Sequence, residues 1–89
     1  MVLYPNPVTD GAETTLQVYL TEPGSVRAMV FTTAYRKVNE MVWSDLPVGV
    51  NPLKLPIRGS NGEALANGVY HLRVITSRGN DLAKLIVLR

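Results

Sequence analysis

The chain has 89 residues, of which 46% are hydrophobic and 18% are charged, so it has the size and composition of one small globular domain and not of a disordered segment. It contains no cysteine, which excludes a disulfide framework and a metal site built from thiolates. Its 9 Lys and Arg and 7 Asp and Glu are scattered and leave a formal charge of +2, which argues against nucleic-acid binding, and no apolar run reaches the roughly 18 residues of a membrane span.

Turn residues recur about every 8 to 12 positions and separate segments that alternate between apolar and polar residues. This spacing predicts an all-β chain of seven strands. A short helix is an alternative within residues 34–45, although Val42 and Trp43 favour a strand there. The expected strands are an extended segment around Tyr4-Pro-Asn-Pro7, followed by residues 13–20, 25–33, 36–43, 50–57, 68–76 and 82–88.

The first turns are marked by glycine and proline. Asp10-Gly11 predicts a turn before residues 13–20, and Glu22-Pro23-Gly24 suits a type II turn in which Gly24 has a positive φ. Residues 25–33 are apolar on both faces, because Met29 and Phe31 alternate with inward valines. That pattern predicts a central strand or one with a covered outer face.

The middle of the chain holds one irregular strand and one edge strand. Val38, Met41 and Trp43 do not share one period, and a β-bulge between them would reconcile the pattern. Residues 50–57 alternate cleanly but contain Pro52 and Pro56, which lack N–H donors, so this strand should lie at a sheet edge.

The last third gives the clearest signal. Asn61-Gly62 marks a loop, Gly68 opens a strong strand, and Arg78-Gly79-Asn80 predicts the tip of the final hairpin. A tyrosine just after a turn glycine, here Tyr70, can return its hydroxyl to upstream backbone as a tyrosine corner. We therefore expect residues 1–89 to form a single seven-stranded antiparallel immunoglobulin-like (fibronectin III-like) β-sandwich.

Reactive side chains are sparse. His71 is the one histidine, and the sequence supplies no partner that would make it a general base, so we expect an exposed strand residue and no enzyme activity. The carboxylates fall in or beside turns, where solvation explains them. A calcium site formed by Asp10 with Glu13, or by Asn80 with Asp81, is the main alternative, and we expect no cofactor or bound metal.

Aromatic residues raise a separate alternative. Trp43 with Tyr4, Tyr19 and Tyr35 could form a flat platform for glycans, although a tryptophan in a small domain more often packs in the core. That reading requires Trp43 and two of the tyrosines on one open face.

Several motifs resemble two related bacterial families in the right order. These families are the immunoglobulin-like domain of the flagellar hook-capping protein and the C-terminal sorting domain of proteins exported by type IX secretion. The matching segments are Leu3-Tyr-Pro-Asn-Pro7, Val26 to Val30, Gly62-Glu-Ala-Leu65-Ala-Asn-Gly68-Val-Tyr70, Gly79 and Lys84-Leu-Ile-Val-Leu-Arg89.

The resemblance implies a module from the C-terminal end of a larger protein that is secreted, or displayed at the bacterial surface, by way of the periplasm. It implies sorting or surface attachment as the function, with Leu65, Gly68, Tyr70, Gly79 and Lys84 as the motif residues. The expected partners are other domains of the parent protein and the export machinery or a surface protein, and the domain itself is expected to be a monomer. A passive spacer or protein-interaction domain is the alternative function.

Overall fold

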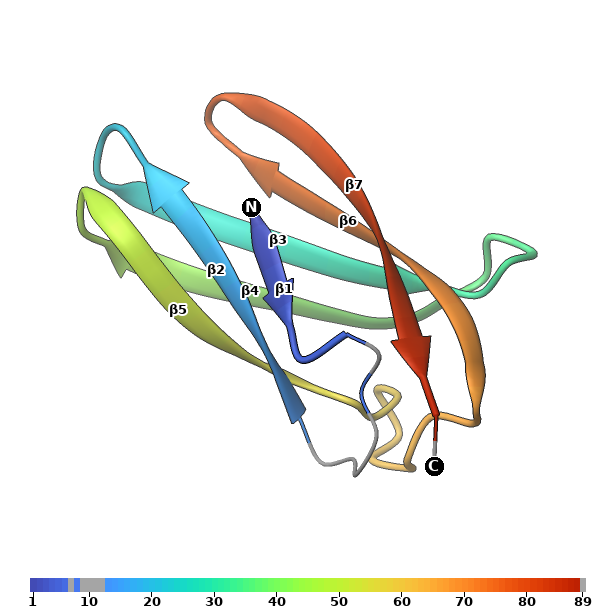
Figure 1. Ribbon diagram of the computed structural model, residues 1–89. Coiled ribbons are helices and arrows are strands. Elements are labelled where there is room, and N and C mark those ends of the chain that lie inside the picture. The colour runs from blue at the N-terminus through green and yellow to red at the C-terminus, as the bar shows by residue number, and fades with distance from the viewer. Residues whose placement is uncertain (7, 9–12, 89) are drawn as a thin grey trace.

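The computed structural model describes residues 1–6, 8 and 13–88, and in this part of the chain it contains seven strands and no helix (Figure 1). The strands are β1 (Val2–Tyr4), β2 (Glu13–Leu20), β3 (Gly24–Phe31), β4 (Lys37–Leu46), β5 (Gly49–Pro56), β6 (Gly68–Thr76) and β7 (Gly79–Val87). The predicted all-β fold of seven strands is confirmed, and β2 and β6 have the predicted ends. The expected turn at Asp10-Gly11 and the terminal Arg89 lie outside the described residues.

The strands form two antiparallel sheets that pack as a sandwich. One sheet has the order β1-β2-β5 and the other has the order β4-β3-β6-β7. The fourth strand pairs with β3 and not with β5, as expected for the fibronectin III-like arrangement. β5 lies at an edge, as its two prolines predicted, and β3 lies inside its sheet. Both predictions for these strands are confirmed.

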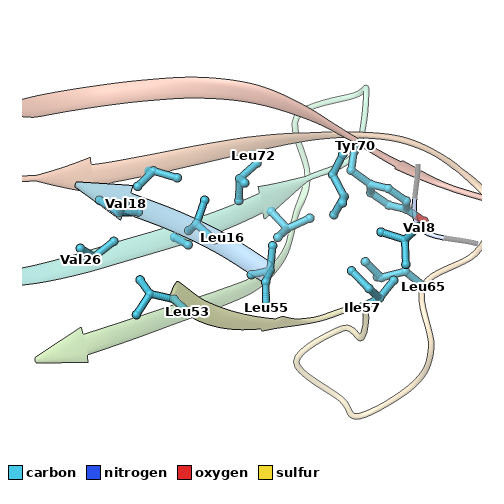
Figure 2. Close-up of a cluster of buried hydrophobic side chains, with 14 of the residues drawn as sticks. Val8, Leu16, Val18, Val26, Leu53, Leu55, Ile57, Leu65, Tyr70 and Leu72 are labelled. Carbon is cyan, nitrogen blue, oxygen red and sulfur yellow. The ribbon is translucent and has the colours of Figure 1, made fainter. Parts of the chain in front are cut away.

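The core fills the space between the sheets with one side chain from every second position. Leu16 and Leu55 face Val26 and Leu72 from the opposite sheet, and all four are fully buried (Figure 2). The same alternation puts Lys54 and Arg73 on the outer surfaces. Two buried polar side chains, Thr14 and Asn51, are satisfied: Thr14 Oγ1 donates to Pro5 O at 2.9 Å, and Asn51 Nδ2 donates to Pro47 O at 2.9 Å.

β4 is irregular, as its apolar pattern predicted. The register against β3 shifts between Val30 and Phe31, whose partners are Asn39 and Lys37, so Val38 is the additional residue. Because of this bulge, Val38, Met41 and Trp43 all pack against the core.

Two turn predictions were wrong in detail. Gly24 does not have a positive φ, because it pairs with Leu46 as the first residue of β3 and is not the third residue of a type II turn. The final hairpin turns at Ser77 and Arg78, one residue earlier than expected, since Thr76 pairs with Gly79. Gly79 is the first residue of β7, and its φ of 124° closes the turn in the way of hairpins with a glycine after the loop.

Candidate functional site

No metal-binding cluster is found in the described part of the chain. Residues 1–6, 8 and 13–88 hold no group of three or more His, Asp or Glu side chains placed to bind a metal ion. Asp10, half of one proposed calcium pair, is outside this part of the chain. No helix in the described segments is long and apolar enough to cross a membrane. The remaining candidates are the motif residues and the surfaces around them.

Three motif residues meet at one end of the sandwich. Leu65 and Tyr70 are 7% and 8% exposed, and with Val8 and Ile57 they form what we call the corner cluster (Figure 2). Leu65 reaches the core because its N–H donates to Ile57 O at 3.1 Å, which folds the loop before β6 back onto β5. Gly68 then starts β6 opposite Val87 with a φ of 154°.

Tyr70 links this loop to the sheet. Its hydroxyl donates to Ala66 O at 2.7 Å, which is the upstream backbone bond that the sequence predicted. Its ring fills the corner cluster while its polar tip reaches the exposed loop, so both ends of the side chain are satisfied. Tyr70 therefore holds the loop before β6 on the core.

The edge of β7 that faces away from β6 is partly covered by the start of the chain. Asn6 Nδ2 donates to Lys84 O at 2.8 Å, and Ile86 N donates to Asn6 Oδ1 at 3.0 Å, so one amide side chain takes the place of a neighbouring strand. Val8 continues the pairing: its N donates to Ile86 O at 2.8 Å and its O accepts from Leu88 N at 2.9 Å. The end of β7 is thereby held on both edges.

The two other motif residues lie away from the corner cluster. Gly79 is at the far end of the β6–β7 hairpin, beside Thr76. Lys84 lies in the middle of β7, is exposed, and is paired in register with His71. The structure thus brings together Leu65, Gly68 and Tyr70, and it leaves Gly79 and Lys84 separate from them.

Aromatic side chains do not gather around Trp43. Trp43 is half-buried and packs on the core from β4. Tyr4 and Tyr19 lie on the outer face of the other sheet, where Tyr4 Oη donates to Gln17 Oε1 at 3.2 Å. The arrangement required for the glycan alternative is absent among these residues.

A different aromatic feature stands on the outer face of the four-stranded sheet. Tyr35 stacks on His71 with ring centroids 5.1 Å apart and planes inclined by 6°. His71, expected to be exposed, is half-buried. A hollow of about 300 Å³ lies beside the stack and is lined by Phe31, Tyr35, His71, Arg73 and Leu82.

Within the part of the chain that the structure describes, some charged side chains on this face form ion pairs and others do not. Glu40 pairs with Lys37 at 2.6 Å and with Arg27 at 3.2 Å. The hydrogen bond from Lys37, together with the positive charges of Lys37 and Arg27, holds the pKa of Glu40 below its usual range despite some opposing desolvation. Neither Arg73 nor Lys84 takes part in an ion pair among the described residues.

The sequence pattern indicated neither the hydrogen bonds of Asn6 to β7 nor the stacking of Tyr35 on His71. The Asn6 contact joins residues 78 and 80 positions apart, and no local pattern reports such a distance. Tyr35 has a left-handed φ of 64° within a hydrogen-bonded turn from Thr32 to Arg36. No glycine or other sequence signal marks that conformation at this position.

No family model and no curated protein matches this sequence. Two solved structures from Porphyromonas gingivalis are similar in fold. A domain of dimeric latent PorU matches 98% of this chain with a TM-score of 0.78 and 20% identity. A domain of PorZ, described as an essential bacterial surface component of the type IX secretion system, matches 99% with a TM-score of 0.68 and 22% identity. This chain spans 9% of the PorU chain and 11% of the PorZ chain.

Proposed function

We propose that this domain is a sorting or surface-attachment module of a secreted or surface bacterial protein, and that export machinery recognises it in its folded state. The observation that carries the proposal is the structural match over 99% of the chain to a domain of PorZ, a surface component of type IX secretion. The sorting-domain motif at Leu65, Gly68, Tyr70, Gly79 and Lys84 supports the same assignment. The module is non-enzymatic, and its partners are the rest of its parent protein and the export machinery.

Recognition of the folded state is supported by the position of the last strand. Leu85 and Val87 are fully buried, and the backbone around them is bonded to β6 on one side and to Asn6 and Val8 on the other. A receptor for the unfolded C-terminal peptide would have to break both sets of bonds and expose the core. A receptor for the folded domain reads the exposed side chains of β7 at no such cost.

The same geometry decides which export experiment is informative. Deleting residues 82–89 removes Leu85 and Val87 from the core, so that variant loses its fold together with any signal. Point substitutions on the surface avoid this problem. Lys84→Glu changes an exposed side chain of β7. Lys54→Glu makes the same charge reversal on β5 of the other sheet, where it also removes the exposed 3.4 Å ion pair between Lys54 and Glu13.

The test fuses residues 1–89 to the C-terminus of a periplasmic reporter in a bacterium with type IX secretion. We expect the reporter at the cell surface with the unchanged domain and with Lys54→Glu, and reduced surface reporter with Lys84→Glu. Protease resistance of the fused domain checks that each variant is folded. A folded, unchanged domain that leaves its reporter in the periplasm overturns the sorting assignment and supports the spacer function.

A further inference from the structure

One part of the β7 edge has no hydrogen-bonded neighbour among residues 1–6, 8 and 13–88. In an antiparallel pair, alternate residues direct N–H and C=O away from the partner strand, and the bonds of Lys84 O and Ile86 N to Asn6 identify the even-numbered residues as the outward ones. Asn80 and Leu82 therefore direct both groups outward, as Lys84 does with its N–H. Within the described chain, no hydrogen bond reaches this stretch of the edge.

The free edge adjoins the hollow on the outer face. Tyr35 and Leu82, at 73% and 70%, are the most exposed large hydrophobic side chains in the described residues, and both line this hollow. A left-handed backbone at Tyr35, held by Tyr35 N to Thr32 O at 2.9 Å and Arg36 N to Thr32 Oγ1 at 3.2 Å, keeps its ring over His71. Two exposed apolar residues and a strained, bonded turn thus border one concavity.

The charge around the hollow selects an anionic partner. Arg73 lies directly opposite Leu82, and Lys84 is the next residue of β7 whose side chain is on the same face of the sheet. Both cations are exposed and lack an ion pair, as noted above. The carboxylate that the strands place on this face, Glu40, belongs to β4 and is already bound by Lys37 and Arg27. Asp81 is exposed on β7 itself, but it pairs with Val74 and shares the alternation of Leu85 and Val87, so it lies on the other face of the strand from Leu82 and Lys84. An incoming carboxylate on the outer face would therefore meet Arg73 and Lys84.

We propose that this surface binds an extended, acidic and apolar peptide segment of a partner protein, which adds to β7 as a further strand. Its backbone bonds to Asn80, Leu82 and Lys84, as in other cases of strand addition to a free sheet edge. A large apolar side chain of the segment lies beside Leu82 at the mouth of the hollow, and a carboxylate lies beside Lys84, since cross-strand neighbours are about 5 Å apart. This docking site does not depend on the export role proposed above.

The experiment selects peptides from a randomised octapeptide display library on the folded 89-residue domain. We expect enriched peptides in which Asp or Glu lies two positions from a large apolar residue, so that both side chains share one face of the added strand. We also expect slower exchange of the Leu82 and Lys84 amide protons when a synthetic selected peptide is added. Lys84→Glu should weaken binding about tenfold, whereas Lys84→Arg should change it by less than about threefold.

The edge is tested with a matched pair at position 82. Leu82→Pro removes an outward N–H but no bond to β6, and Leu82→Thr removes the same apolar side chain while keeping that N–H. We expect the proline variant to bind about tenfold more weakly than the threonine variant. If circular dichroism shows that the proline variant is unfolded, the test of the edge is the exchange of the Leu82 and Lys84 amide protons in the unchanged domain.

Four outcomes of the binding experiments overturn the proposal. They are no enriched peptide, enriched peptides without carboxylates, binding with no protection of the Leu82 and Lys84 amides, and equal binding by the two position-82 variants. Self-association of the domain that Leu82→Pro abolishes, seen by analytical ultracentrifugation, also overturns it and assigns the edge to a second copy of the chain.

Discussion

Removing the hydroxyl of Tyr70 isolates the energetic role of the corner bond. Tyr70→Phe keeps the ring in the corner cluster and deletes only the 2.7 Å bond to Ala66 O. A buried hydrogen bond of this kind contributes about 0.5–1.5 kcal/mol. Ala66 is exposed, so water replaces the lost donor, and we expect the lower part of that range. The expected loss of unfolding free energy is about 0.5–1 kcal/mol.

Tyr70→Ala sets the scale for comparison. It removes an aromatic ring that is 8% exposed, for which truncation costs about 3–5 kcal/mol. A domain of 89 residues has a total stability of roughly 4–13 kcal/mol. The alanine variant therefore loses a large share of the total stability, while the phenylalanine variant stays folded with a Tm lower by about 2–8 °C.

The measurement is urea unfolding of the three proteins, followed by circular dichroism and by Trp43 fluorescence. We expect equal m-values for the unchanged and Tyr70→Phe proteins, because both bury the same surface. Two results would refute the reasoning: a phenylalanine variant as unstable as the alanine variant, or one whose stability is unchanged within error. The first would give the hydroxyl a larger role than one hydrogen bond, and the second would give it none.

Three further perturbations test other parts of the fold. Asn6→Ala should lower the free energy of unfolding by roughly 1–2 kcal/mol, because it removes two hydrogen bonds to β7. The control is Asn80→Ala, which removes an exposed amide from β7 itself and should lower the free energy of unfolding by less than about 0.5 kcal/mol. Gly79→Ala should cost about 1–2 kcal/mol because its φ is 124°, whereas Gly24→Ala should be nearly neutral; no atom lies within 4 Å of an added Cβ at either position, so a clash cannot explain a difference. Glu40 has a lowered pKa in the folded state, so its contribution is complete above the usual glutamate value of about 4.3 and is lost as the pH falls through the lower folded value. The stability difference between the unchanged protein and Glu40→Gln should therefore be constant near pH 7 and shrink toward pH 3, and a difference that grows on acidification would contradict the assigned ion pairs.

The sequence predicts the sandwich well because each strand carries its own period. Leu53 and Leu55 alternate with exposed positions over the whole of β5, and the prolines of that strand give its place at the edge. The bulge at Val38 was also visible, as a break in the period. Such features depend on neighbours within a few residues, which a single sequence contains.

The candidate surface was less predictable because it depends on long-range contacts. Nothing near Asn6 in the sequence indicates that its amide bonds to β7, and nothing near Leu82 indicates that the edge beside it is left open. The stack of Tyr35 on His71 joins the turn after β3 to the third strand that follows it, β6. The outer apolar face of β3 was visible as Met29 and Phe31, but the hollow beside it needed the register of three strands and a loop.

The motif residues differ in what they leave for a partner to recognise. Leu65 and Tyr70 are buried in the corner cluster, and Gly68 and Gly79 adopt backbone conformations with positive φ, so each of the four has a structural reason to be present. Lys84 differs, because only its backbone is used, by Asn6, and its side chain is free on the outer face. In the proposed export role, substitutions at the first four positions would therefore act by changing the fold. If a receptor reads the folded domain, Lys84 and the open edge beside it are where a variant can lose recognition and keep its stability.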